Sequence, residues 1–257
     1  MIYEVNGLSF SYGDKSVLKD ISAVFMEGQL CTVLGRNGAG KSTFFSCLLG
    51  LLKPQKGEIL LCGRPLRELR EREISALVSY VPQNHSPAFA YTVLDFVLMG
   101  CASRIGLFSR PGKEEESAVW EALERLDIRD FASRPYTELS GGERQQVTIA
   151  RALAAKPKAI LFDEPTAHLD SGNQLRVLRL IRELSSDGYA VCVTTHDPNH
   201  ALLLGGSVLL FDGKGGAESG SAEELICEEK LSAIYGSELK IRYMEEFGRK
   251  VCIYPSL

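Results

Sequence analysis

The chain has 257 residues, 45% of them hydrophobic and 24% charged, with a formal net charge of −4 at pH 7. This composition is typical of an ordinary globular protein, and the weak negative charge gives no general reason to expect nucleic-acid binding. The longest apolar runs are strand-sized and far shorter than the ~20 residues that a membrane helix needs, so we expect no membrane span.

Two further features bear on the cellular compartment. The first ten residues lack a basic region followed by an apolar one, so a secretory signal is not expected. The seven cysteines are scattered, odd in number and contain no C-x-x-C pair. That pattern favours free thiols in a reducing cytosol over a disulfide or zinc framework.

The amino-terminal part of the chain predicts strands around a glycine-rich loop. Short apolar or alternating segments predict strands at residues 2–12, 16–28, 29–35, 57–63 and 77–82. From Lys41 onward the apolar side chains recur at helical spacing, which predicts a buried helix over residues 41–52.

Beyond Pro82 the periodicity becomes helical. Amphipathic helices are predicted at residues 92–100, 114–128 and 143–155. Val119, Leu123 and Leu126 share one face of the second of these. This change from strand-like to helical spacing of the apolar residues indicates a helical insertion between about residues 84 and 155.

After Pro157 the chain alternates strands and helices again. Apolar strands are predicted at residues 158–163, 189–195 and 207–213, with helices at 171–188 and 198–206. Such alternation implies a mainly parallel sheet covered on both faces, so the fold is predicted to be α/β. Residues 214–224 are predicted to be a loose loop, and residues 239–255 a hairpin that turns near 246–248.

Residues 35–43, GRNGAGKST, fit the G-x-x-x-x-G-K-[ST] pattern with a strand before and a helix after it. The glycines let backbone N–H groups converge on phosphates at a helix amino end. Lys41 is predicted to reach the β- and γ-phosphates, and the Ser42 hydroxyl to bind Mg²⁺. A chance glycine turn before a helix is the alternative, and the correct flanks argue against it.

Two carboxylates end the apolar strand AILFD. Asp163 fits the role of holding Mg²⁺, and Glu164 that of polarising the attacking water. Their position matches the edge of an α/β sheet where ligands bind. Taken alone, they are equally consistent with carboxylates that begin a turn.

Two more polar residues follow predicted strands. His196 could hydrogen-bond the γ-phosphate and hold the water in line, while His85, His168 and His200 are interpreted as structural. Gln83 could touch Mg²⁺ or the water and report the nucleotide state to the helical insertion. A polar loop residue is an equally good interpretation of Gln83.

Tyr12 lies on a predicted strand just before the glycine loop, and Val17 follows shortly after. The Tyr12 ring could stack on adenine, because base–aromatic stacking typically contributes ~1–3 kcal/mol. A cross-strand aromatic pair that packs the sheet is the alternative.

The chain resembles the ATP-binding cassette (ABC) ATPases over essentially its whole length. The motifs occur in that family's order: Tyr12, the glycine loop, Gln83, LSGGERQ at 139–145, LFDEP at 161–165, AHLD at 167–170 and His196. The resemblance implies a P-loop NTPase (RecA-like) core with an antiparallel β-subdomain and an inserted helical subdomain. Residues 1–83 and 156–257 are expected to form the core and β-subdomain, and residues 84–155 the helical subdomain.

The resemblance also implies site residues and a dimer. ATP is expected to contact Tyr12, Val17, Asn37, Gly38, Ala39, Gly40, Lys41, Ser42, Thr43, Ser140, Gly141, Gly142, Gln145 and Asp170. Mg²⁺ is expected at Ser42, Gln83 and Asp163, and catalysis from Glu164, His196 and Gln83. Two copies are implied to pair head to tail, so that Ser140–Gly142 face the γ-phosphate held by the partner's loop.

A transport role is favoured over DNA repair or translation, because the insertion has no sustained heptads and no zinc-type cysteines. Residues 86–100 resemble the importers of iron–siderophore complexes, haem, cobalamin and molybdate, although Cys101 stands where those often have Arg. Residues 241–255 resemble the terminal hairpin of the iron-chelate and cobalamin members. The resemblance implies two integral-membrane permease subunits, indirectly a substrate-binding protein, no nucleic acid, and a place on the cytoplasmic face of the cell membrane. Another importer, an exporter or a non-transport ABC ATPase is the alternative.

Overall fold

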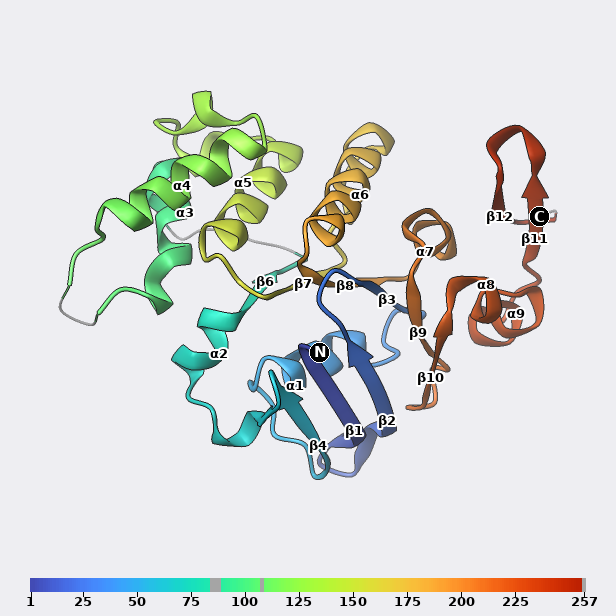
Figure 1. Ribbon diagram of the computed structural model, residues 1–257. Helices are drawn as coiled ribbons and strands as arrows, with labels where there is room; N and C mark the ends of the chain where they lie inside the picture. Colours follow the sequence, from blue (N-terminus) through green and yellow to red (C-terminus); the bar gives the residue numbers. More distant parts are fainter. Residues whose placement is uncertain (84–88, 107–108, 256–257) are drawn as a thin grey trace. The chain divides into compact units, whose positions relative to one another are not determined.

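The computed structural model describes residues 1–83, 89–106 and 109–255. It divides into two compact units, one made of Met1–Leu69 with Leu180–Leu257 and the other of Arg70–Arg179. Each unit has its own strands and buried side chains (Figure 1).

The first unit contains an antiparallel sheet in the order β2-β1-β4-β5. Its strands are β1 (Tyr3–Tyr12), β2 (Lys15–Phe25), β4 (Lys56–Leu61) and β5 (Arg64–Pro65). Tyr3 pairs with Phe25 on one side and with Leu61 on the other, and all three side chains are buried. Alternation of buried and exposed residues along β2 shows that one face of this sheet is packed and the other is exposed.

The same unit holds the parallel strands that the sequence predicts. β3 (Leu30–Leu34) lies between β8 (Ala190–Thr195) and β9 (Ser207–Phe211), parallel to both. Every residue of β3 and β8 is buried, as expected for strands covered on both faces. Helices α1 (Lys41–Leu48) and α7 (Pro198–Leu204) follow β3 and β8. The carboxyl ends of β3 and β8 meet at the pair Leu34–Thr195.

The second unit contains a parallel pair and most of the helices. β6 (Val78–Val81) runs parallel to β7 (Ala159–Asp163). Its helices are α2 (Glu71–Leu77), α3 (Val93–Leu98), α4 (Lys113–Arg125), α5 (Gly141–Ala154) and the first part of α6 (Ser171–Ser186). The two units together confirm the predicted α/β fold with mainly parallel core strands and an antiparallel β-sheet.

An aromatic stack joins the helices of the second unit. Phe96 of α3 stacks on Tyr136 with ring centroids 4.2 Å apart and planes inclined by 25°. The Arg151 guanidinium of α5 lies 4.9 Å from the centroid of the Phe96 ring. The Tyr136 hydroxyl is 3.1 Å from Thr148 Oγ1 on α5. The predicted helix at 92–100 therefore packs against α5, the helix that follows Ser140.

Two predictions need correction. Residues 214–224 are not a loose loop, because β10 (Ala217–Ser221) pairs antiparallel with β9 and is followed by α8 (Ala222–Leu225). The Asp212 carboxylate accepts hydrogen bonds from the backbone N–H groups of Lys214 and Gly216, which closes the turn between the strands. The helix predicted at 92–100 ends at Leu98 and continues as a 3-10 segment, Met99–Ser103.

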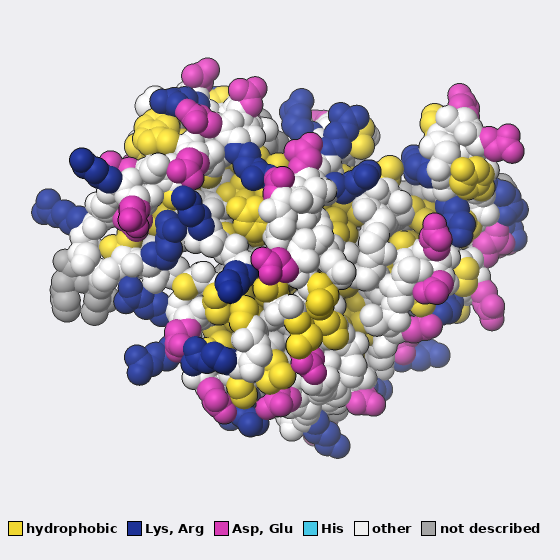
Figure 2. Space-filling view, in the orientation of Figure 1, with side chains coloured by type: hydrophobic (Ala, Val, Ile, Leu, Met, Phe, Trp, Pro, Cys, Tyr) yellow, Lys and Arg dark blue, Asp and Glu magenta, His cyan; other side chains and the backbone are white. Residues whose placement is uncertain are grey.

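The carboxyl-terminal segment forms α9 (Glu228–Tyr235) and the predicted hairpin, β11 (Lys240–Met244) and β12 (Arg249–Ile253). The hairpin exposes Tyr243, Phe247 and Tyr254. On the face of the protein drawn in Figure 2, basic and acidic side chains are interspersed.

Candidate nucleotide site

The glycine loop in the first unit presents backbone where side chains cannot fit. Gly40 has φ 104°, and a methyl group added there would come within 3.1 Å of Val17 and Leu18 on β2. The loop therefore packs directly on the antiparallel sheet, and only glycine is tolerated at this position. A glycine-rich turn that leads into a helix amino end is the kind of backbone that binds polyphosphates in other proteins.

Lys41 begins α1, with its side chain only 5% exposed. Its Nζ donates to the carbonyl oxygens of Gly35 at 2.8 Å and Arg36 at 3.2 Å. The ammonium group is therefore held inside the loop. Around it, the predicted phosphate-loop residues Asn37, Gly38 and Ser42 are exposed, Ala39 is buried, and Thr43 is half-buried.

Tyr12 ends β1, and its side chain is 53% exposed. Its ring contacts Phe10 of the same strand edge-on, with centroids 4.9 Å apart. The cross-strand partner of Tyr12 is Lys15, so no aromatic pair bridges β1 and β2 at this position. The exposed ring fits the stacking role better than the packing alternative.

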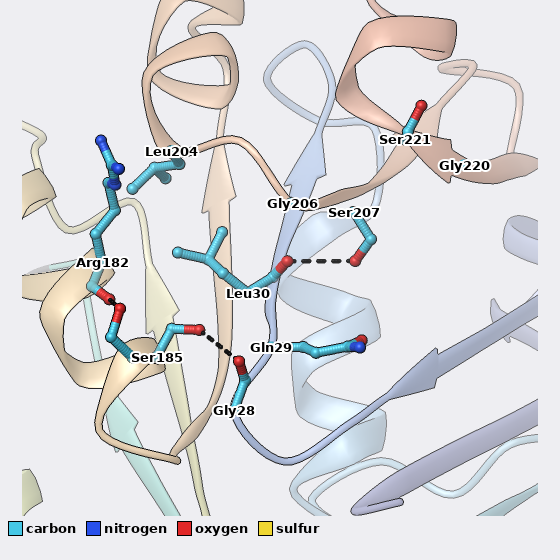
Figure 3. Close-up of a pocket in the computed structure, with 11 residues that line it drawn as sticks. Gly28, Gln29, Leu30, Arg182, Ser185, Leu204, Gly206, Ser207, Gly220 and Ser221 are labelled. Carbon is cyan, nitrogen blue, oxygen red and sulfur yellow. Dashed lines mark hydrogen bonds between the residues drawn. The ribbon is translucent and has the colours of Figure 1, made fainter.

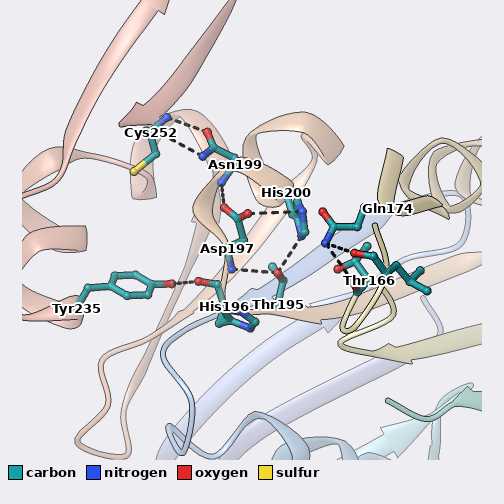
Figure 4. Close-up of polar contacts among 10 residues, drawn as sticks. Thr166, Gln174, Thr195, His196, Asp197, Asn199, His200, Tyr235 and Cys252 are labelled. Atoms are coloured by element: carbon teal, nitrogen blue, oxygen red, sulfur yellow. Dashed lines mark hydrogen bonds and ion pairs between the residues drawn. The ribbon is translucent and has the colours of Figure 1, made fainter. Parts of the chain in front are cut away.

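His196 follows β8, and its side chain is exposed. The next residues form a bonded turn that begins α7 (Figure 4). The Asp197 carboxylate accepts from the Asn199 N–H at 2.8 Å, and the Asp197 N–H donates to Thr195 Oγ1 at 3.1 Å.

His200 also belongs to this turn. Its Nδ1 is 3.4 Å from Thr195 Oγ1, and its Nε2 lies 3.5 Å from the Asp197 carboxylate. Burial lowers the pKa of His200, so the imidazole is favoured in its neutral form. These contacts support the structural interpretation of His200. His168 is exposed in the second unit, and His85 lies outside the described residues.

In the second unit, β7 delivers both predicted carboxylates. Asp163 is 5% exposed and accepts a hydrogen bond from the Tyr80 hydroxyl at 3.2 Å. Burial, then the Asp163 charge, raise the pKa of Tyr80, so the phenol stays a donor. Glu164 adopts φ 45°, a left-handed conformation that is uncommon for a residue other than glycine. Gln83 Nε2 lies 3.5 Å from Glu164 Oε2.

The LSGGERQ motif at 139–145, which we call the signature segment, begins helix α5 with a reciprocal cap. Ser140 Oγ accepts from the Glu143 N–H at 3.4 Å, and the Ser140 N–H donates to the Glu143 carboxylate at 2.7 Å. The bonds with Ser140 lower the pKa of Glu143 below its usual value. The Arg134 guanidinium, 2.9 Å from Glu143 Oε1, lowers it further. The cap places Gly141 and Gly142 in the first helical turn, where the helix dipole favours anions.

Asn173, which sequence reasoning missed, contacts two of the predicted site residues. The Asp170 carboxylate accepts from the Asn173 N–H at 2.9 Å and from Asn173 Nδ2 at 2.7 Å. A methyl group added at Gly142 would lie 3.0 Å from that same amide. Asn173 thus fixes Asp170 and lies against the signature glycine. The Asp-x-x-Asn spacing, typical of a helix cap, is the signal that could have found it.

Gln145 of the signature segment has a buried Nε2, for which the described part of the chain supplies no hydrogen-bond acceptor. A buried polar atom without an acceptor is costly and requires an explanation.

A separate cavity of about 540 Å³ lies in the first unit (Figure 3). Residues at the amino ends of β3 and β9 line this cavity. The glycine loop follows the opposite, carboxyl end of β3. The Ser185 and Ser207 hydroxyls both donate to backbone carbonyls there, of Gly28 and Leu30. None of the predicted nucleotide residues lines this cavity, so we do not place ATP in it.

Comparison with known families decides the assignment. A family model described as "ABC transporter" matches residues 18–167, more than half of the chain. The chain belongs to the ABC transporter family. It is an ATP-binding cassette with the ATPase activity of that family, whose ATP-binding subunits dimerise and work with membrane permease subunits.

Curated relatives cover the cassette nearly from end to end. It is 40% identical to an uncharacterized ABC transporter ATP-binding protein of Haemophilus influenzae, over 91% of the cassette and 89% of that relative. It is 35% identical to a "Probable iron chelatin transport ATP-binding protein" of Helicobacter pylori, over 99% of both chains. It is 36% identical to the molybdate import ATP-binding protein MolC of Haemophilus influenzae, over 95% and 92%.

Solved structures of ABC transporter proteins are similar to the cassette as well. The cassette superposes with a TM-score of 0.87 on a solved structure described as "an inward-facing conformation of a putative metal-chelate type ABC transporter", at 33% identity over 99% and 98% of the two chains. Against cbiO1 of Clostridium perfringens, part of the cbiONQ complex, the TM-score is 0.79 at 29% identity over 90% and 92%. Among the described helices of the cassette, none has the length and apolar character to cross a bilayer.

Proposed function

We propose that this cassette is the ATP-hydrolysing subunit of a multi-subunit importer for a metal chelate. The observation that carries the proposal is the similarity, over 99% of the chain, to a metal-chelate type transporter. Relatives named for iron chelatin and molybdate support the same class of cargo. A manganese transport ATP-binding protein of Listeria innocua is 34% identical, so a free metal ion is the alternative cargo.

ATP and Mg²⁺ are the proposed cofactors. The glycine loop from Asn37 to Thr43 binds the phosphates through backbone N–H groups, and Lys41 supplies a positive charge. Ser42, Gln83 and Asp163 offer hydroxyl, amide and carboxylate oxygens, the hard donors that Mg²⁺ prefers beside nucleotide phosphates. Tyr12 and Val17 contact the base. When bound, Mg²⁺ neutralises charge on the transferring phosphoryl group.

Glu164 is the proposed general base. Its carboxylate accepts the proton of the attacking water, Gln83 orients that carboxylate, and His196 holds the water and phosphate in line. The strained backbone at Glu164 supports this role, because such conformations concentrate at functional sites.

A head-to-tail pair of cassettes completes each proposed site. Ser140, Gly141, Gly142 and Gln145 address the phosphate held by the partner's glycine loop, and Asp170 lies at the interface. ATP favours the closed pair because these groups reach it only on closure. The cap on α5 and the bond from Asn173 to Asp170 support the proposal, since they fix both segments in advance.

The remaining partners follow from the importer class. Residues 84–155, as the helical subdomain, dock against two integral-membrane permease subunits on the cytoplasmic face of the membrane, and Gln83 couples them to the nucleotide. A substrate-binding protein delivers the cargo to the permease and never contacts the cassette.

A reconstituted transporter tests this proposal. The cassette is co-expressed with a candidate permease and substrate-binding protein, placed in liposomes, and assayed with labelled ferric siderophore, molybdate and Mn²⁺. We expect ATP-dependent uptake of a chelate or oxyanion, which is absent with the Glu164→Gln variant. Uptake of Mn²⁺ alone contradicts the chelate assignment, and efflux contradicts import.

A further inference from the structure

The His196 loop is bonded directly to the carboxyl-terminal segment of the chain. The Tyr235 hydroxyl, at the end of α9, donates to the backbone carbonyl of His196 at 2.7 Å (Figure 4). The two residues are 39 positions apart in the sequence. This bond fixes the peptide that follows His196, and with it the direction in which the imidazole leaves the backbone.

Asn199 makes a second connection from the same loop. Its side-chain Nδ2 donates to the Cys252 carbonyl at 3.0 Å, and its Oδ1 accepts from the Cys252 N–H at 2.9 Å. The amide therefore bonds to β12 through a donor and an acceptor, as a neighbouring strand would. Because Asn199 also follows the Asp197 cap, β12 is bound to the turn that contains His196.

The elements that make these bonds are themselves anchored. The Tyr235 ring packs against a buried cluster that includes Leu34, Leu231 and Leu239. The Glu228 carboxylate, at the start of α9, accepts from the Ile241 N–H at 3.0 Å and from Arg242 at 2.6 Å. Helix α9 and the hairpin therefore form one bonded body behind the His196 loop.

We propose that the carboxyl-terminal segment, Glu228–Ile253, positions His196 for hydrolysis, with Tyr235 and Asn199 as its positioning residues. This inference rests on the proposed role of His196. Displacement of a catalytic group by about 1 Å can cost on the order of 10²-fold in rate, so one hydrogen bond to its backbone is sufficient to matter. A ligand that moves the exposed hairpin would change hydrolysis through the same two contacts.

The Tyr235→Phe variant removes only the hydroxyl and keeps the ring in its cluster. We expect kcat for ATP hydrolysis to fall about 3- to 30-fold, with KM for ATP and the melting temperature unchanged. Tyr254→Phe is the matched control, because Tyr254 is 80% exposed and lies one residue beyond this segment. Asn199→Ala is the second variant and should lower kcat in the same direction. Wild-type kcat in both Tyr235→Phe and Asn199→Ala overturns the proposal.

A spectroscopic measurement separates this inference from the proposed function. In protein labelled with ¹⁵N-histidine, the His196 ring signals, assigned with His196→Ala, should shift in Tyr235→Phe and stay in place in Tyr254→Phe. Unchanged signals in Tyr235→Phe overturn the positioning role. If His196→Ala hydrolyses ATP at the wild-type rate, the proposed function of His196 fails instead, while the shift still reports whether Tyr235 positions the ring.

Discussion

Gln83 and Glu164 lie side by side although 81 residues separate them: Nε2 of the glutamine is 3.5 Å from Oε2 of the glutamate. The parallel pairing of β6 and β7 produces this contact, because both residues follow the carboxyl ends of neighbouring strands. A displacement of Gln83 would therefore alter the contacts of Glu164, the proposed base, directly.

Glu164→Gln should reduce ATP hydrolysis at least about 10²-fold, because an amide cannot accept the proton of water. ATP binding should persist, and ATP should trap a dimer in size-exclusion chromatography. The exposed Glu183→Gln on α6 is the matched control. Near wild-type turnover in the variant would remove Glu164 as the base.

Ser140→Arg should abolish ATP-driven dimerisation in light scattering, because the large side chain fills the space that the partner's phosphate requires. Ser140→Ala separates this effect from folding. It removes the Oγ acceptor of the α5 cap and should cost about 1 kcal/mol of stability, measured by urea unfolding. An ATP-dependent dimer of Ser140→Arg would contradict the shared site.

Gly100→Ala should destabilise the second unit by about 1–3 kcal/mol in urea unfolding. A methyl group at this position would overlap the backbone carbonyl oxygen of Arg151 on α5, so one of the two backbones must move. Gly141→Ala is the control, because a methyl group there meets open space. Equal stability of the two variants would show that the 3-10 segment does not pack on α5 as described.

The Glu143 cap should make stability pH-dependent. Its pKa is lowered below the ordinary 4.5, so its contribution is complete at pH values above 4.5 and is lost as the pH falls through the lower, folded-state value. The difference in melting temperature between wild type and Glu143→Gln should therefore shrink as the pH is lowered from about 6 to about 3. A constant difference would mean that the charge of Glu143 contributes nothing.

Tyr12→Ala should weaken ATP binding about 5- to 150-fold, from the loss of ~1–3 kcal/mol of base stacking. Tyr12→Phe keeps the ring and should retain most of the affinity. Isothermal titration calorimetry with ATP in excess EDTA measures both without turnover. Unchanged affinity in Tyr12→Ala would assign the ring to its edge-on contact with Phe10.

Much of the fold was predictable because its signals are local. The apolar runs of β3 and β8 and the apolar face of α4 that carries Val119 and Leu123 are each contained in one short segment. The motifs gave the candidate residues for the same reason. Strand β10 was missed because its sequence, AESGS, has almost no apolar side chain. It exists because Asp212 closes the preceding turn and β9 offers a free edge.

Apart from the local bond between Asn173 and Asp170, the contacts that sequence reasoning missed depend on distant partners. Nothing near Tyr235 or Asn199 indicates a bond to His196 or Cys252, since these contacts span 39 and 53 residues. Asn173 was missed because its role depends on Gly142, on another helix. Such contacts are decided by tertiary packing, which periodicity does not record.

The bonds from Lys41 to the carbonyls of Gly35 and Arg36 give the glycine loop an internal clasp. In the proposed site, the ammonium group that would contact a phosphate already holds the loop in shape before a nucleotide binds. Binding of ATP would exchange the two carbonyl oxygens for phosphate oxygens, and release of the product would restore the two carbonyl contacts. The proposed cycle therefore requires no refolding of the glycine loop between turnovers.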